Sequence, residues 1–225
     1  MKKWLAIDTS MGFIDIGANI GTFSLAVAAM DRPVVAVEPN IETARRLHKA
    51  VSMGGLESRI TLVRNAISKD RNLTRMYTAP TNQGVTIIEQ KADKKGFQTA
   101  NTILMSDLLP LITFKRAVMK IDIEGYEHFA FASSEPLFDA IDIPLVCMEW
   151  FHVKKRAGNK ASEEDRSMFA HMMKVLSDRQ YVACSCVETY SPLPVNGKWP
   201  YNICWRKKQT PPNGDNTHSV AMTPV

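Results

Sequence analysis

The stretch that decides the fold lies at residues 13–25 and reads FIDIGANIGTFSL. Apolar residues lead into Asp15, a turn with glycines at Gly17 and Gly21 follows, and the small apolar residues after Thr22 have the pattern of a helix. We therefore expect a buried strand, a tight glycine turn and a helix N-terminus in direct succession. Such a unit is typical of sites for anionic groups, because the free N–H groups of the first helical turn face the ligand.

The spacing of the glycines narrows the class of ligand. Gly-x-x-x-Gly is neither the Gly-x-Gly-x-x-Gly of dinucleotide sites nor the Gly-x-x-x-x-Gly-Lys of phosphate loops. A pyrophosphate needs close backbone approach at two glycines in quick succession, whereas an amino-acid carboxylate needs less room. The turn therefore favours S-adenosylmethionine over NAD, and a glycine turn with a purely structural role is the alternative interpretation.

Size and composition allow one domain with a full core, since the 225 residues are 45% hydrophobic. The net charge of +5 permits an anionic partner without requiring one. No apolar run is long enough to predict a membrane span, and the start of the chain does not resemble a signal peptide. We expect a cytoplasmic protein. A longer natural chain with a secretory leader or a membrane anchor is the alternative, because the first core strand begins so close to residue 1.

The four cysteines are expected to be reduced, buried thiols. They lie in apolar, strand-like runs and include no Cys-x-x-Cys pair, so we predict no metal site. Reduced thiols would suit a reducing compartment. The cysteines are Cys147, Cys184, Cys186 and Cys204.

Short apolar runs alternate with helical patterns along most of the chain. This alternation predicts an α/β fold with a doubly wound, mostly parallel sheet, in which the last two strands form an antiparallel pair. After the first strand, the expected strands are 34–37, 60–63, 117–123, 145–150, 181–187 and 201–205. The expected helices are 23–30, 42–53, a brief one at 106–110, 125–132, 136–140 and 165–179.

Three segments depart from this alternation. Residues 68–101 are a polar excursion in which we expect short hairpin strands. Residues 152–161 are basic and are predicted to be a loop. Residues 209–225 combine Pro, Asn, Thr and Ser without periodicity, which predicts a disordered tail. The chain is therefore predicted to be a single domain over residues 1–208.

Two polar residues end neighbouring strands, where the ligands of open α/β sheets bind. Glu38 follows Gly17 by 21 positions (38 − 17), and an acidic residue at this distance can accept both hydroxyls of a ribose. The alternative for Glu38 is to cap the next helix or to pair with a lysine. Asn65 is expected either to contact an adenine edge or to lie in a solvated turn.

Charges at Lys120, Asp122 and Glu124 fall on every second residue of a predicted central strand, so all three should face one side. A central parallel strand is normally apolar on both faces, and burying charge is costly unless it is paired. This face is therefore expected to open onto a cleft, unless Lys120 neutralises its neighbours.

Histidines and basic residues near the next strand end have less specific interpretations. His152 follows Glu149 at the same rim, and both His152 and His128 are either site residues or ordinary histidines. The basic residues around 154–160 lack the interleaved aromatic residues of RNA-binding surfaces, so no nucleic-acid partner is expected.

Three blocks, in this order, resemble the FkbM-type methyltransferases, which use S-adenosylmethionine and have the class I Rossmann-like fold. The blocks are DIGANIG at 15–21, VEPN at 37–40 and KIDIEGYE at 120–127, within a match over roughly residues 13–150. The resemblance implies a seven-stranded sheet, cofactor binding by the first two blocks, and mostly O-methylation of small molecules or sugars.

We therefore predict an S-adenosylmethionine-dependent methyltransferase that methylates a hydroxyl of a small-molecule or glycan acceptor. The predicted cofactor-binding residues are Asp15, Gly17, Asn19, Gly21, Glu38, Asn65 and Asp122. The predicted catalytic residues are Asp122, Glu124 and His128, with Asp122 or His128 as the base. The alternatives are an NAD-dependent oxidoreductase and a non-catalytic Rossmann-like binding protein, and the sequence leaves the oligomeric state open.

Overall fold

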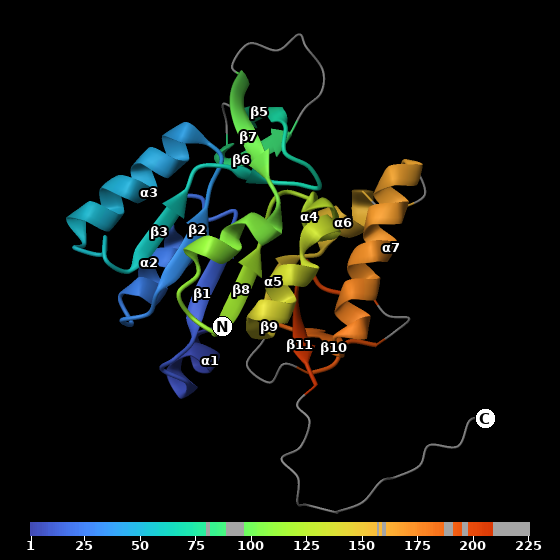
Figure 1. The fold of residues 1–225 in the computed structure, drawn as a ribbon. Coiled ribbons are helices and arrows are strands. Elements are labelled where there is room, and N and C mark those ends of the chain that lie inside the picture. Colours follow the sequence, from blue (N-terminus) through green and yellow to red (C-terminus); the bar gives the residue numbers. More distant parts are fainter. Residues whose placement is uncertain are drawn as a thin grey trace, which may run out of the picture.

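The computed structural model describes residues 1–79, 82–88, 97–156, 158, 161–186, 191–194 and 198–208. It confirms the predicted fold class, because helices cover both faces of a seven-stranded sheet (Figure 1). Along the sheet, the strands are β10 (Tyr181–Ser185), β11 (Asn202–Lys207), β9 (Asp142–Glu149), β8 (Arg116–Ile121), β1 (Gly12–Ile16), β2 (Val34–Val37) and β3 (Ile60–Val63). β11 is antiparallel to both of its neighbours, and the other neighbouring pairs are parallel.

Each face of the sheet packs into its own apolar cluster, which explains why the central strands read as continuous apolar runs. In β2, for example, Val35 and Val37 belong to one cluster, and Val34 and Ala36 belong to the other. In β1 the same alternation places Ile14 and Ile16 in the first cluster, so that Asp15 faces the second side.

The helices on the first side follow β3 in the chain, and those on the second side come earlier. The helices are α1 (Lys2–Ile7), α2 (Thr22–Ala28), α3 (Ile41–Met53), α4 (Glu127–Ala130), α5 (Glu135–Ala140), α6 (Phe151–Arg156) and α7 (Glu163–Asp178), with 3-10 turns η1 (Met105–Leu111) and η2 (Phe131–Ser133). Within the described ranges, no helix has the length and apolar character that crossing a membrane requires.

Two helix predictions are corrected by the structure. Residues 152–156 of the expected basic loop belong to α6, since Val153 buries an apolar side chain and three basic residues occupy the favourable last turn. The helix expected from residue 125 begins only at Glu127, because Glu124 and Gly125 both adopt positive φ values of 60° and 90°. Residue 187 of the predicted strand and the predicted tail at 209–225 lie outside the described residues.

The polar excursion forms a second, four-stranded sheet, and the hairpin predicted there is present. Its order is β4 (Ala66–Ile67), β7 (Phe97–Ile103), β5 (Leu73–Ala79) and β6 (Asn82–Ile88), with β5 and β6 antiparallel. This small sheet lies at the end of the molecule toward which the parallel strands run (Figure 1). It thus adds a wall to the edge of the main sheet at which ligands of this fold bind.

We predict that Gly17→Ala lowers the free energy of unfolding far more than Gly55→Ala. Both glycines have positive φ, of 78° and 63°, so each alanine carries the backbone cost of about 1–2 kcal/mol. At Gly17 the added Cβ would also lie 1.9 Å from the carbonyl oxygen of Asp122, whereas at Gly55 it would meet nothing within 4 Å. Urea denaturation measures both losses, and equal losses would contradict the close approach of the loop to the end of β8.

Candidate functional site

A cavity of about 450 Å³ lies at the carboxyl ends of β1, β2, β3 and β8, within the size range of small-molecule sites. Its wall includes the glycine loop that follows β1, Glu38 after β2, Asn65 after β3, and Asp122 with Glu124 after β8. The predicted site residues of four different strands are thus brought to one cavity.

Several backbone N–H groups of the glycine loop donate to acceptors within the protein, whereas the sequence suggested that such groups face a ligand. The amides of Gly17 and Ala18 donate to the carbonyl of Val37, and the amide of Gly21 donates to Ala18. The amide of Asn19 donates to the Glu38 carboxylate at 2.8 Å. These bonds hold the loop across the end of β2. Thr22 and Phe23, in the first turn of α2, also line the cavity.

Gly21 does not line the cavity. It caps α2 with φ of 87°, and a Cβ at this position would lie 2.2 Å from Leu47 Cδ1. The residue is glycine because α2 and α3 pack closely here, so its relation to a ligand is indirect.

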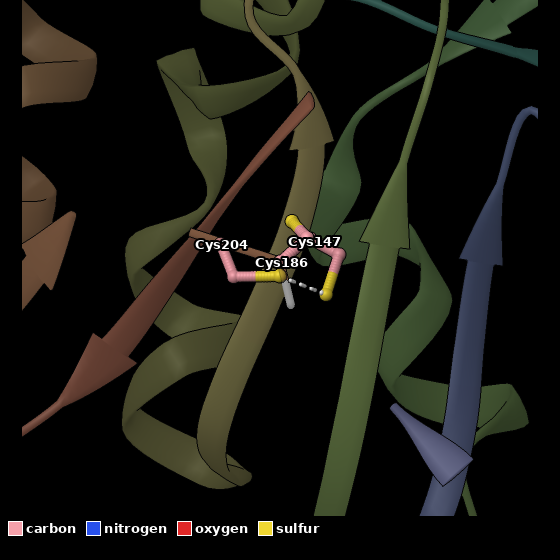
Figure 2. A group of neighbouring side chains, drawn as sticks. All are labelled: Cys147, Cys186 and Cys204. Atoms are coloured by element: carbon pink, nitrogen blue, oxygen red, sulfur yellow. Dashed lines mark hydrogen bonds between the residues drawn. The ribbon is translucent and has the colours of Figure 1, made fainter. Parts of the chain in front are cut away.

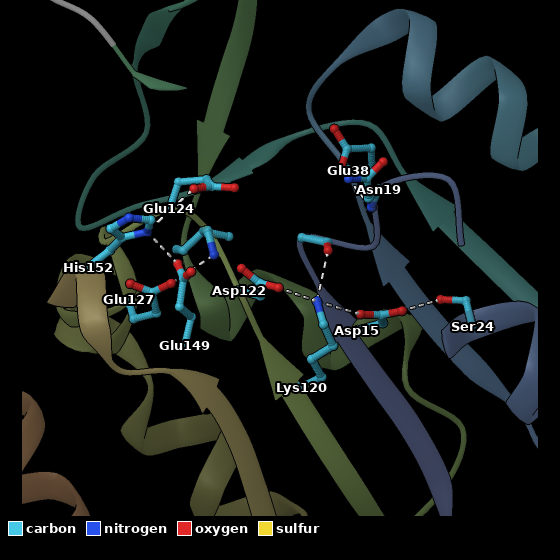
Figure 3. A network of polar contacts seen from close by, with 12 residues as sticks. Asp15, Asn19, Ser24, Glu38, Lys120, Asp122, Glu124, Glu127, Glu149 and His152 are labelled. Carbon is cyan, nitrogen blue, oxygen red and sulfur yellow. Dashed lines mark hydrogen bonds and ion pairs between the residues drawn. The ribbon is translucent and has the colours of Figure 1, made fainter. Parts of the chain in front are cut away.

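Glu38 is a buried link between two turns as well as a cavity residue. One carboxylate oxygen accepts from Asn19 N and the other from Asn40 N, at 2.8 and 2.9 Å. Burial raises the pKa of Glu38, and these backbone donors oppose the rise. The capping alternative is therefore partly realised, and Glu38, which lies beside Asn19, also lines the cavity (Figure 3).

Asp15 lies beneath the glycine loop and does not line the cavity. It is fully buried, accepts a hydrogen bond of 2.6 Å from Ser24 Oγ, and lies 3.6 Å from the ammonium of Lys120. Burial raises the pKa of Asp15, and Lys120 opposes that rise. Through these contacts, Asp15 holds Lys120 and the start of α2 in place beneath the loop.

Lys120 joins the loop to the end of β8. Its ammonium donates to the Gly17 carbonyl at 3.1 Å and lies 3.3 Å from an oxygen of Asp122 (Figure 3). Both alternatives for this charged face are realised, since Lys120 neutralises its neighbours and all three charged residues line the cavity.

Glu124 and His152 form a second polar group at the same rim. His152 Nδ1 lies 2.8 Å from Glu149 Oε2 and 3.6 Å from Glu124 Oε2, and Tyr201 lies on its other side at 3.4 Å from Nε2. Burial, together with the nearby charges of Glu149 and Asp122, raises the pKa of Glu124 to about 7. Glu124 can therefore exchange a proton near neutral pH.

His128, the predicted alternative base, is not brought to the cavity. It is fully buried, and its Nε2 lies 3.2 Å from Asp165 at the start of α7. Burial lowers the pKa of His128. The positive φ values before α4 change the phase of the helix, so the position expected to face the site faces α7 instead.

Asn65 lines the cavity, but its side-chain amide also donates to the Asn101 carbonyl at 3.0 Å. Several lining residues were not predicted from the sequence, because they come from the excursion or from α3, or are uncharged residues within the third block. They include Met76, Arg46, Thr43, Ile123 and Tyr126. Of these residues, only Tyr126 could have been suspected from its type, as an aromatic residue next to the charged positions. Its ring centroid lies 3.7 Å from the Arg156 guanidinium carbon.

A second cavity of about 260 Å³ adjoins the first, and both are bordered by Phe23, Lys120 and Asp122. Glu149 and Asn202 line it from β9 and β11. Two neighbouring cavities that share Asp122 can hold two molecules side by side.

The order of the strands and the cavity at their carboxyl ends define the fold as the class I, Rossmann-like fold that methyltransferases have. The family model described as "Methyltransferase FkbM domain" matches residues 15–183, well over half of the chain, and the chain belongs to this family. No curated protein matches the chain.

Two solved structures give the scale of the likeness. The methyltransferase FkbM from Methylobacillus flagellatus KT is 16% identical with a TM-score of 0.54, covering 87% of this chain and 43% of that chain. The magnesium protoporphyrin IX methyltransferase from Synechocystis PCC 6803, solved with bound SAM, is 14% identical with a TM-score of 0.45, covering 90% and 73%. The chain thus spans less than half of the FkbM structure, and this likeness concerns the fold.

We predict that Glu127→Gln flattens the pH dependence of stability. Glu127 is fully buried, one of its oxygens accepts from Ile123 N, and burial raises its pKa to about 8. Between its ordinary pKa and 8, the folded protein keeps a proton that the unfolded chain releases, so stability falls by up to about 1.4 kcal/mol per pH unit as the pH rises. Glutamine does not titrate, so the variant lacks this contribution to the pH dependence of stability.

The measurement is urea denaturation between pH 5 and 8, with the exposed Glu57→Gln as the matched control. Parallel stability curves for Glu127→Gln and the unchanged protein would show that Glu127 does not bind this proton.

Proposed function

We propose that this chain binds S-adenosylmethionine in the larger cavity and transfers its methyl group to a hydroxyl of a small-molecule or sugar acceptor. The carrying observation is the single cavity that joins the glycine loop, Glu38 and Asp122. The proposal is further supported by the family assignment, which also argues against an NAD-dependent oxidoreductase.

The cofactor would lie across the strand ends, with its amino-acid part at the loop. In this arrangement Gly17 and Asn19 border the methionine part, Glu38 accepts from the ribose hydroxyls, and Asn65 lies at the adenine end. Asp15 and Gly21 act indirectly, by fixing the loop. Asp122 borders both cavities, so its carboxylate is proposed to lie beside the sulfonium, where a negative charge is favourable.

Methyl transfer from a sulfonium is an in-line displacement. A bond forms between the acceptor oxygen and the methyl carbon, the S–CH₃ bond breaks, and its electron pair stays on sulfur, which leaves as a neutral thioether. The protein must align the two partners and take the hydroxyl proton. We assign that proton to Glu124, because its pKa of about 7 is closer to working pH than that of an ordinary carboxyl group.

The acceptor is proposed to occupy the smaller cavity. The proposed class of acceptor is tested by incubating the chain with methyl-labelled S-adenosylmethionine and fractionated cell extract. Label in the small-molecule or glycan fraction supports it. Label only in RNA or protein would overturn the acceptor class, and no label in any fraction despite cofactor binding would favour a non-catalytic binding protein.

Glu38→Gln is expected to weaken binding of S-adenosylhomocysteine at least tenfold, because a neutral amide can no longer accept from two hydroxyls while retaining both backbone bonds. Isothermal titration calorimetry gives the affinities. Glu42→Gln, an exposed change on α3, serves as the control. Unchanged affinity in Glu38→Gln would remove the ribose assignment.

Glu124→Gln is expected to lower kcat by about 100-fold or more, with little change in cofactor affinity, because it removes the base. In the unchanged protein, kcat should rise with pH through about 7, as Glu124 loses its proton. A Glu124→Gln variant that keeps both its rate and this pH profile would show that another group takes the proton.

A further inference from the structure

Three of the four cysteines meet at one point of the main sheet, although the chain has no Cys-x-x-Cys pair. Cys147 lies on β9, Cys204 lies on β11, and Cys186 follows directly after β10. Their sulfur atoms all lie within 4.8 Å of one another (Figure 2). Cys147 and Cys204 are buried, but Cys186 is exposed, which corrects the expectation that all four are buried.

The position of β11 explains this cluster. The strand runs back between β9 and β10, so Cys204 pairs directly with Cys147 although 57 residues separate them. Cys184 pairs with Cys204 on the other side, but its thiol donates to the Cys204 carbonyl and is not part of the cluster. Spacing along the chain could not predict this group, because it depends on the insertion of an antiparallel strand.

The cluster opens onto the smaller cavity. All three cysteines line it, together with Lys120, Asp122 and Glu149. The sulfur atoms of Cys147 and Cys204 are 2.7 Å apart, and the sulfur of Cys186 lies within 4.8 Å of both, so one ion can contact all three.

We propose that Cys147, Cys186 and Cys204 form a three-sulfur site for a thiophilic divalent cation such as Zn²⁺, with its fourth position open to the smaller cavity. Cysteine sulfur is an ordinary zinc ligand, and three protein ligands with an exchangeable fourth position are the pattern of open zinc sites. Zinc–sulfur bonds of about 2.3 Å place the sulfurs ~3.8 Å apart, so binding separates the Cys147 and Cys204 sulfurs from their present contact. Binding of the metal releases the protons of the ligating thiols to solvent.

This site is independent of the proposed methyl transfer, and it departs from the absence of a metal site expected from cysteine spacing. Its place gives it a further consequence, since Lys120 and Asp122 border both cavities. A sulfur, nitrogen or oxygen ligand taken up at the open position would lie on the acceptor side of the proposed cofactor.

The test uses the full chain, reduced with a phosphine and freed of metal, and titrated with Cd²⁺ as a spectroscopic probe for Zn²⁺. We expect a thiolate-to-metal charge-transfer band that saturates at one equivalent. Cys186→Ser should weaken Cd²⁺ binding by about 100-fold or more, since even the loss of an outer-shell partner costs 10–100-fold. Cys184→Ser is the matched control and should bind Cd²⁺ like the unchanged protein.

Absence of the band, or equal weakening in both variants, would overturn the proposal. Mass spectrometry of the unreduced protein adds an outcome: a Cys147–Cys204 disulfide that persists in place of metal binding would show a redox pair instead. Because Cys186 is exposed, serine there should leave the thermal unfolding curve unchanged. Binding of S-adenosylhomocysteine, measured on the same samples, separates failure of this site from failure of the proposed function.

Discussion

The site depends on one buried ammonium group. Lys120 is almost enclosed, yet it contacts the Gly17 carbonyl, Asp122 and Asp15 at 3.1, 3.3 and 3.6 Å. A buried charge is tolerated only when its surroundings compensate it, so the loop, the end of β8 and the buried carboxylate are held in a fixed relation. Asp15 is fixed in turn by Ser24 at the start of α2.

This constraint links the polar interior of the sheet to the cavity above it. Asp15, Lys120, Cys147 and Cys204 occupy successive partner positions across β1, β8, β9 and β11. One row of the sheet thus carries a carboxylate, an ammonium and two thiols where a parallel sheet is normally apolar. Within this row, Lys120 borders both cavities, and Cys147 and Cys204 border the smaller one.

Much of this arrangement could be predicted from the sequence, because it rests on local pattern. The strands at 34–37 and 60–63 have the predicted bounds, and charges at every second position around Lys120 indicated an opening on that side. The family resemblance is confirmed by the match over residues 15–183. The glycine turn also lies where it was predicted, between a buried strand and a helix.

The predictions that were wrong or missing depended on three-dimensional geometry that the pattern of residues along the sequence does not contain. The left-handed residue Glu124 shifts the phase of α4 and turns His128 away from the cavity. Met76 reaches the cavity from the small sheet, whose fold over the strand ends could not be inferred from a polar composition. The cysteine cluster required knowledge of which strands are neighbours. The assignment of 1–208 as a single domain stays a prediction.

We propose above all that a sulfonium nucleoside lies across the strand ends, from the loop at Gly17 to Glu38. A crystal structure of the chain grown with S-adenosylhomocysteine tests it most directly. We expect the ribose within hydrogen-bonding distance of Glu38 and the thioether sulfur beside Asp122. A ligand bound elsewhere, or lying with its ribose away from Glu38, would contradict it.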